Sequence, residues 1–191
     1  MKIIMKKISL VLLATLSFSF LPSSKVEIKK VNISNSTIKW VGYKLTGKHE
    51  GTITLKKGEL MFENNTLVGG KFIMDMTSIN TTDLGGGSKE RLDGHLKSED
   101  FFDSYKFKTA TMVFENVKPT TNGYRVNANL TIKNITKPVV FNMEVSGNSA
   151  KTKLKIDRTK YNITYKSATM TSILKDKAIY DEFDLSVSLK F

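Results

Sequence analysis

Cysteine is absent from the 191 residues, and histidine occurs only twice, as His49 and His95. Without cysteine the chain has no disulfides, no thiolate metal ligands, no cysteine nucleophile and no N-terminal cysteine for a lipid anchor. Two histidines do not suffice for a three-histidine zinc site, so any metal would need carboxylates as well. We therefore expect neither a metal centre nor a cofactor.

Arginine is scarce, and the common catalytic motifs are missing. The 30 Lys and Arg outweigh 18 Asp and Glu, but only Arg91, Arg125 and Arg158 are arginine. Nucleic-acid readers depend on arginine for bidentate base contacts, so we interpret the surplus as solvated lysine and expect no nucleic-acid partner. The sequence contains no GxSxG, Walker, HExxH or GxGxxG motif. No carboxylate pair has a spacing that requires acid and base roles, so the sequence does not indicate an enzyme.

Only one long apolar run occurs, at the N-terminus. Three lysines precede a mainly apolar run of 14 residues, 8–21, which ends at a Pro-Ser-Ser sequence. This is the layout of a secretory signal peptide, and a run of this length falls short of the roughly 20 residues that a spanning helix needs. We expect cleavage after Ser19 or near Ser24. Residues 1–24 are thus predicted to be a signal peptide, and residues 25–191 one domain, in the periplasm or secreted, with no integral membrane association after cleavage.

From Thr37 onward, apolar and polar residues alternate with the period of two that is typical of strands with one buried face. The clearest case is the last stretch, where apolar residues occupy every odd position from Phe183 to Phe191. Turn sequences between such runs predict antiparallel hairpins, at Lys57-Gly58, Asn64-Asn65, Asn122-Gly123 and Gly147-Asn148. The predicted strands are residues 38–44, 51–56, 59–63, 70–76, 109–117, 124–132, 138–145, 150–156 and 183–191.

Residues 84–103 are the exception to the alternation. Three glycines at 85–87 indicate a flexible loop, after which Ser88 is predicted to cap a short helix through Leu92 and Ser98 to cap another turn. Nine or so strands with one small helical insert must pack their apolar faces against one another, in a sandwich or a barrel. The hairpin order favours an all-β, antiparallel, up-and-down β-barrel of about eight strands with a short helical insert.

Alternation alone leaves open whether such a barrel is filled or holds a ligand, because eight strands permit both. The candidates that line its interior are large apolar residues, with adaptable methionine among them: Trp40, Phe72, Met74, Met112, Phe114, Phe141, Met143 and Phe183. Phe101 and Phe102, in the insert, are predicted to point inward. They belong either to a lid over the barrel mouth or to a plug that closes its end.

Three polar residues stand out from the surface lysines. His49 lies in a glycine-punctuated turn, and it either contacts a ligand head group or is satisfied by a local carbonyl. His95 lies within the insert. Arg158 follows the strand at 150–156, where we expect a carboxylate to hold its guanidinium, a structural arrangement more often than a catalytic one.

Four segments, in this order, resemble the YceI-like family of bacterial secreted, lipocalin-like proteins. The first two are residues 38–51 and 92–103. LTIKNITKPV at 130–139 resembles the family's LTIKGVTKPV hairpin, and residues 156–163 resemble its DRxxYGI segment. Asn134 and Asn162 stand where the family commonly has glycine, and asparagine tolerates the left-handed backbone of such turns. The similarity covers residues 34–191.

The resemblance implies a barrel with an amphiphile in its interior, typically a polyisoprenoid or another long-chain lipid or amide, and no established catalytic step. It favours a hollow barrel in which the ten apolar residues named above contact the ligand. His49, His95 and Arg158 are then the candidates for the polar head group. We expect a periplasmic or secreted protein that sequesters or carries a polyisoprenoid, an isoprenoid quinone or a fatty-acid-like lipid.

Three alternatives remain. A small outer-membrane barrel would explain a signal peptide followed by alternating strands, although most predicted strands are shorter than the usual ~9–11 residues of spanning strands. An enzyme acting on a lipid or isoprenoid in the same cavity would use His49 or His95 as a general base. A structural or stress-induced secreted protein would have a filled barrel. A homodimer is compatible with each of them.

Overall fold

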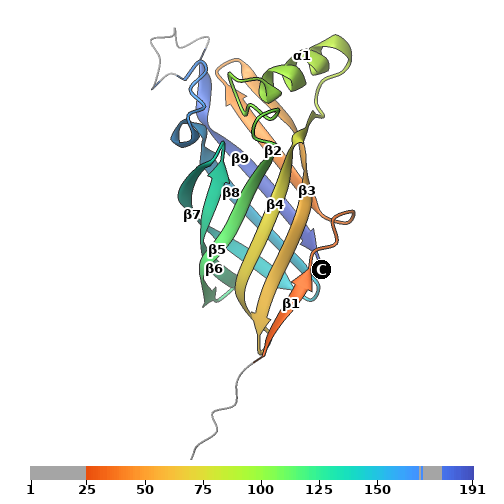
Figure 1. The fold of residues 1–191 in the computed structure, drawn as a ribbon, viewed down its shortest axis with the longest axis vertical. Helices are drawn as coiled ribbons and strands as arrows, with labels where there is room; N and C mark the ends of the chain where they lie inside the picture. Colours follow the sequence, from red (N-terminus) through yellow and green to blue (C-terminus); the bar gives the residue numbers. More distant parts are fainter. Residues whose placement is uncertain (1–24, 168, 170–177) are drawn as a thin grey trace, which may run out of the picture.

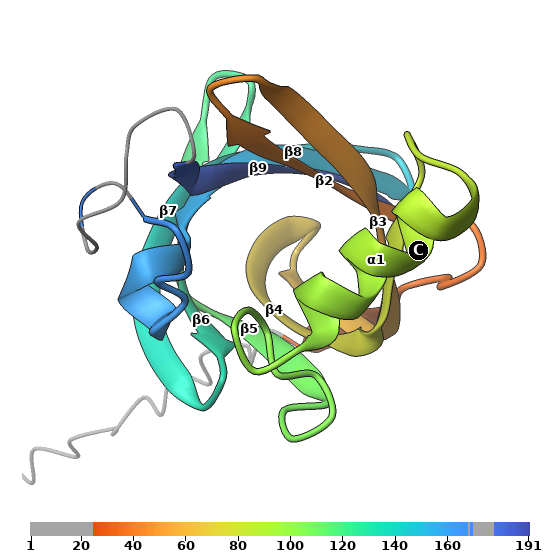
Figure 2. The same cartoon turned by 90° about the horizontal axis from the view of Figure 1, so that it is seen from above.

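The strands form one closed antiparallel barrel in the computed structural model, which describes residues 25–167, 169 and 178–191. The predicted signal peptide lies outside the described residues. From β2 to β9 each strand pairs with the next along the chain, and β9 pairs with β2 to close an eight-stranded barrel (Figures 1 and 2). The prediction of an all-β, up-and-down barrel with one helical insert is confirmed.

The elements occur in the following order along the chain. They are β1 (Val26–Lys30), β2 (Thr37–Lys44), β3 (Gly47–Glu63), β4 (Thr66–Thr81), α1 (Gly86–Lys97), β5 (Thr109–Thr120), β6 (Gly123–Ile132), β7 (Ile135–Ser146), β8 (Ser149–Asp157), the 3-10 helix η1 (Arg158–Tyr161) and β9 (Ile179–Lys190). The sequence analysis did not predict β1. It pairs with residues 59–63 of β3, beyond the part of β3 that β2 covers.

Lys57-Gly58 is not a hairpin turn, as the sequence analysis predicted, because β3 continues through it as a single strand of 17 residues. The buried positions are Gly51 and Leu55 before this point and Gly58 and Leu60 after it, so the buried face changes from odd to even positions. The pairing with β4 shifts its register between Leu55 and Lys57. An inserted bulge residue produces this change of parity, and in the sequence it looks like the end of one strand and the start of another.

The other predicted turns connect hairpins. Asn64 and Asn65 have φ of 49° and 64°, and Asn134 has φ of 60°. These left-handed conformations suit two-residue hairpin turns, in which asparagine is well tolerated. Asn162 also adopts φ of 57°, so both positions at which the family commonly has glycine keep the expected backbone.

The helical insert differs from its prediction at both ends. The helix α1 begins at Gly86, within the predicted flexible loop, and Gly85 rather than Ser88 is its N-cap. It extends to Lys97, and Ser98 is its C-cap, with a hydroxyl that donates to the carbonyl of His95. In Figure 2, α1 lies across the barrel end on the side of β3 and β4.

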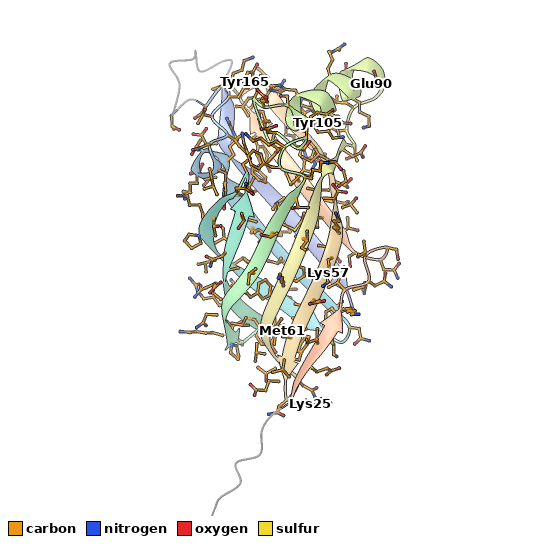
Figure 3. The ribbon with its side chains drawn as sticks, viewed as in Figure 1. Lys25, Lys57, Met61, Glu90, Tyr105 and Tyr165 are labelled. Atoms are coloured by element: carbon orange, nitrogen blue, oxygen red, sulfur yellow. The ribbon has the colours of Figure 1, made fainter. Side chains whose placement is uncertain are left out.

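The two ends of the barrel differ in how they are filled. We call the end that carries α1, the β2–β3 turn and η1 the mouth end, and the end that carries the β3–β4, β5–β6 and β7–β8 turns the closed end. Figure 3 shows Glu90 and Tyr165 at the mouth end and Lys25 and Met61 at the closed end. Leu60, Leu67 and Val126 are almost completely buried and lie outside the lining of the internal cavity described below. Side chains thus fill the barrel near the closed end.

Candidate ligand-binding site

A cavity of about 220 Å³ occupies the interior of the barrel toward the mouth end. All ten apolar residues predicted to line the interior contribute to its wall. So do His49, His95 and Arg158. Exposed residues at its rim, among them Lys44 and Tyr180, place its opening at the adjoining ends of β2, β3 and β9. Whether these residues contact a ligand stays a prediction.

Aromatic rings from three strands contact one another in tilted and edge-on arrangements in the inner part of the cavity. The ring centroids of Phe72 and Phe114 lie 5.4 Å apart, and those of Phe114 and Phe141 lie 5.8 Å apart. Near the mouth end, Phe102 meets Phe183 edge to face at 6.2 Å. Such contacts give the wall a defined shape, because aromatic pairs prefer offset or edge-on arrangements.

The indole of Trp40 packs against the backbone of Gly51, the residue opposite it on the neighbouring strand. Trp40 and Gly51 are register partners on β2 and β3. A Cβ atom on Gly51 would overlap the carbonyl oxygen of Asn80 and would come within 2.5 Å of the Trp40 indole. The indole N–H donates to the carbonyl of Thr52 at 3.2 Å, so the polar atom of the ring is satisfied and its apolar surface faces the cavity.

The cavity also has lining residues that the sequence analysis did not name as site residues. They are mainly aliphatic: Ile38, Ile53, Leu55, Met76, Ile79, Leu92, Leu96, Ala110, Leu130, Ile132, Leu154, Ile179, Leu185, Val187 and Leu189. Alternation had already placed several of them on inward faces, and β6 and β8 show this clearly in their burial patterns. The alternation in the sequence therefore indicated that these residues point inward, but it does not distinguish a cavity wall from a packed core.

His49 forms a pair with a carboxylate at the rim of the cavity. Its Nδ1 lies 2.9 Å from Asp83 Oδ2, and the Glu50 N–H donates to the other oxygen of Asp83 at 3.0 Å. Burial raises the pKa of Asp83, but the hydrogen bonds from Glu50 and His49 outweigh it and hold the pKa below its ordinary value. The partner of His49 is therefore a carboxylate that is remote in sequence, rather than the local carbonyl considered above.

His95 lies on the last turn of α1, among aromatic rings. Its ring meets Tyr165 at 4.5 Å and Phe101 at 5.2 Å, both edge to face. Its Nε2 atom is buried, and no described residue is its hydrogen-bond partner.

Arg158 connects η1 to the start of β9. Its buried guanidinium donates to the carbonyls of Tyr180, Ile163 and Ile179 at 3.1, 2.7 and 3.0 Å. Asp181 Oδ1 lies 3.5 Å from the guanidinium, but it has no hydrogen-bond partner among the described residues. The three carbonyls therefore position the guanidinium, with Asp181 as a nearby counter-charge rather than the hydrogen-bonded carboxylate that we expected. Burial lowers the pKa of Arg158, which the charges of Asp181 and Asp157 partly offset.

Within the part of the chain that the structure describes, no group of three or more His, Asp or Glu residues could hold a metal ion. None of the described helices is long and apolar enough to cross a membrane.

The fold and the cavity define a lipocalin-like barrel, in which eight strands surround an interior large enough for a small ligand. The chain belongs to the YceI-like domain family, whose sequence profile matches residues 28–191. The family assignment made from the four sequence segments is therefore confirmed.

Individual proteins are similar to this chain in part of the sequence or in the fold. A UPF0312 protein of Yersinia enterocolitica is 39% identical over 69 residues, which are 36% of this chain and 35% of that protein, so the chain matches only about a third of this relative's length. BcnA of Burkholderia cenocepacia superposes with a TM-score of 0.66 at 20% identity, over 83% of this chain and 98% of BcnA. A polyisoprenoid binding domain from Saccharophagus degradans superposes with a TM-score of 0.55 at 13% identity, over 86% of this chain and 97% of that domain.

Proposed function

We propose that this protein binds and carries a long-chain amphiphile, such as a polyisoprenoid, an isoprenoid quinone or a fatty-acid-like lipid, in the cavity of its barrel. The observation that carries the proposal is an apolar cavity that ends at a packed floor on one side and at a rim of polar residues on the other. Each CH₂ group that moves from water into such a cavity contributes about 0.8 kcal/mol. An apolar chain therefore needs few polar contacts for tight binding, and the fold similarity to a polyisoprenoid binding domain supports this choice of ligand.

The size of the cavity favours a single chain. Its volume of about 220 Å³ is below the ~300–1,000 Å³ of ordinary ligand pockets. Met74, Met112 and Met143 line it, and methionine side chains rearrange readily. A long ligand therefore displaces methionine side chains or extends through the rim at Lys44 and Tyr180.

The charged outer surface of the barrel supports a protein that works in water rather than as an outer-membrane barrel. On β8 the outward residues Lys151, Lys153 and Lys155 alternate with buried residues. A membrane-spanning barrel would instead turn apolar side chains outward. We propose a periplasmic or secreted location, which cell fractionation and N-terminal sequencing would test. A mature chain that starts at Met1 and sediments with membranes would contradict it.

An enzyme acting on the same ligand is the second candidate, and Asp83 is the observation in its favour. It orients His49 as a general base requires. Incubation with radiolabelled fatty-acyl and prenyl esters tests this function. Products that form with the wild-type protein but not with His49→Gln would establish an enzyme. If the esters remain unchanged, the protein is a binding protein without this activity.

Native mass spectrometry of protein purified from its own host without detergent tests the binding function. We expect a copurifying apolar mass. The matched variants are Ala110→Leu, which fills the cavity, and Thr111→Leu on the same strand, whose side chain lies outside the cavity lining. Ala110→Leu should lose the ligand mass and Thr111→Leu should keep it, with circular dichroism as the control for folding. An empty wild-type protein that also fails to take up added lipid would overturn the proposal.

A further inference from the structure

One of the residues that line the cavity, His95, has a buried side-chain atom without a hydrogen-bond partner among the described residues. Trp40 donates to Thr52, and the Thr152 hydroxyl donates to the Asn142 carbonyl at 2.6 Å. The Nε2 atom of His95 is buried and has no hydrogen-bond partner among residues 25–167, 169 and 178–191. Buried polar atoms in folded proteins are almost always hydrogen-bonded, so this one points to a partner that the described residues do not supply.

The position of the His95 ring is fixed from two sides. Phe101 and Tyr165 both meet it edge to face. The helix that carries it is attached to the barrel, because the Asp93 carboxylate accepts from the Thr81 N–H at 2.7 Å and pairs with Lys89. The ring is thus a preorganised contact at one end of an apolar cavity, which is how polar groups orient ligands in such pockets.

The cavity lining contains the basic residues Lys44 and Arg158 and no Asp or Glu among the described residues. The Arg158 guanidinium lies over the ring of Phe101, at 5.4 Å from its centroid, and Phe101 is one of the two rings that meet His95. Arg158 lines the cavity, whereas its counter-charge Asp181 does not. The N–H groups of Arg158 already donate to three carbonyls, so Arg158 contributes its positive potential while His95 supplies the free hydrogen-bonding atom.

We propose that Nε2 of His95 donates a hydrogen bond to the polar end of the ligand, and that this end is a carbonyl or carboxylate oxygen. The inference rests on the proposed function and narrows it to ligands such as fatty acids, fatty amides or quinones. A ligand with an ammonium end is disfavoured, because it would bring a positive charge toward Arg158 and has no acceptor for the imidazole N–H. An acceptor selects the tautomer with the proton on Nε2.

Histidine NMR tests this inference, because the chain has only two imidazole rings to assign. The probes are four chains of equal length: hexadecanoic acid, hexadecanamide, hexadecylamine and hexadecane. We expect the ¹⁵N signal of His95 Nε2 to move with the acid and the amide and to stay in place with hexadecane. We also expect the acid and the amide to bind roughly fivefold to tenfold tighter than the amine. A response at His49 in place of His95 would overturn the inference.

Two variants of His95 separate its hydrogen bond from its packing. His95→Phe keeps an aromatic ring but removes Nε2, and His95→Gln restores a donor. His95→Phe should lose the preference for the acid and the amide while still binding hexadecane, and His95→Gln should regain part of it. Arg91→Gln, on the exposed side of α1, is the control and should bind like the wild type.

The possible failures are distinct. If the chains bind but neither the His95 signal nor the His95 variants distinguish their ends, the inference is wrong and the proposed function stands. If none of the four chains binds and the protein from its own host carries no lipid, the proposed function is wrong and the inference falls with it. The NMR experiment uses the wild-type protein, so it decides the matter even where a variant folds poorly.

Discussion

Single residues set the shape of the cavity wall, and Gly51 is the clearest example. A glycine in the middle of a strand costs stability relative to alanine, because it is flexible in the unfolded chain and adds no packing. At Gly51 the indole of Trp40 occupies the space that a side chain would need. Gly42, on the neighbouring strand and also at the cavity, has open space instead, since a Cβ atom there meets no described atom within 4 Å.

Gly51→Ala and Gly42→Ala are therefore expected to act in opposite directions. Gly51→Ala should lower the free energy of unfolding by about 1–3 kcal/mol, because the new methyl group forces Trp40 and the backbone at Asn80 to move. Gly42→Ala should leave it unchanged or raise it by up to about 1 kcal/mol. Urea denaturation of both variants measures this. If both variants lost the same free energy of unfolding, the contact with Trp40 would not be the reason that position 51 requires glycine.

The burial of Tyr161 is expected to make the folded protein less stable as the pH rises into the alkaline range. It is 1% exposed, and burial, together with the nearby charge of Asp157, raises its pKa to about 12. An unfolded tyrosine ionises near pH 10. The folded protein keeps a proton that the unfolded chain loses, so this contribution to stability is complete below pH 10 and disappears as the pH rises from 10 to 12.

The Tyr161→Phe variant should remove this pH dependence. Two pH units correspond to about 2.7 kcal/mol, so the wild type should lose on the order of 2 kcal/mol more than the variant between pH 9 and pH 11.5. The midpoints of urea denaturation at the two pH values give the comparison. Lysine ionisation affects both proteins equally, so it cancels in the difference between their free energies of unfolding. Parallel losses would show that Tyr161 titrates normally in the folded state.

Residue types could be predicted from the sequence better than their partners could. Scarcity and motif position selected His49, His95 and Arg158, and all three line the cavity. Asp83 could not be foreseen as the partner of His49, because the two residues are 34 positions apart and the β3–β4 register shifts between them. Pairing across a bulged sheet depends on where the bulges fall, and alternation does not show this.

At the level of elements, the turns with left-handed asparagines could be predicted because their chemistry is local. The start of α1 could not, since three glycines are poor helix formers and nothing near them in sequence shows that tertiary contacts hold the helix. Those contacts are Asp93 with Thr81 and Lys89 with Asn80 on one side, and the Lys133 ammonium with the carbonyl of Phe101 at 3.0 Å on the other. They attach the insert at two points, which bears on whether it is a lid or a plug.

Asp93→Ala tests these two alternatives. Burial raises the pKa of Asp93, but its hydrogen bonds with Lys89 and Thr81 outweigh this and lower it, which shows that the carboxylate is held in its charged form. If α1 opens to admit ligand, the variant should take up and release lipid several-fold faster with little change in affinity, and α1 amides should exchange faster. Glu90→Ala, on the exposed side of α1, is the control. Unchanged rates in Asp93→Ala would identify α1 as a permanent plug.

The two ends of the barrel differ in packing, and we expect stability to depend mainly on the closed end and ligand binding on the mouth end. Toward the closed end, Leu60, Leu67 and Val126 form a packed core, and toward the mouth end the same barrel holds a cavity. Packed cores lose stability steeply when a methylene is removed, because the neighbours close the gap only in part. A residue beside an existing cavity is packed on one side only, so its truncation affects the ligand more than the fold.

Leu60→Ala and Leu185→Ala test this division with one substitution at two places. Leu60 is 0% exposed and away from the cavity, whereas Leu185 lines the cavity and pairs with Trp40 across β9 and β2. Leu60→Ala should lower the free energy of unfolding by about 3–5 kcal/mol and leave the Kd for a hexadecanoyl probe unchanged. Leu185→Ala should cost less than half as much stability and weaken the Kd by roughly tenfold, because the ligand then has less apolar surface to pack against. Urea denaturation and probe titration, done on both variants, separate the two effects. If Leu60→Ala weakened binding as much as Leu185→Ala, the packed end would belong to the ligand site, and the cavity would be longer in the loaded protein than in the empty barrel.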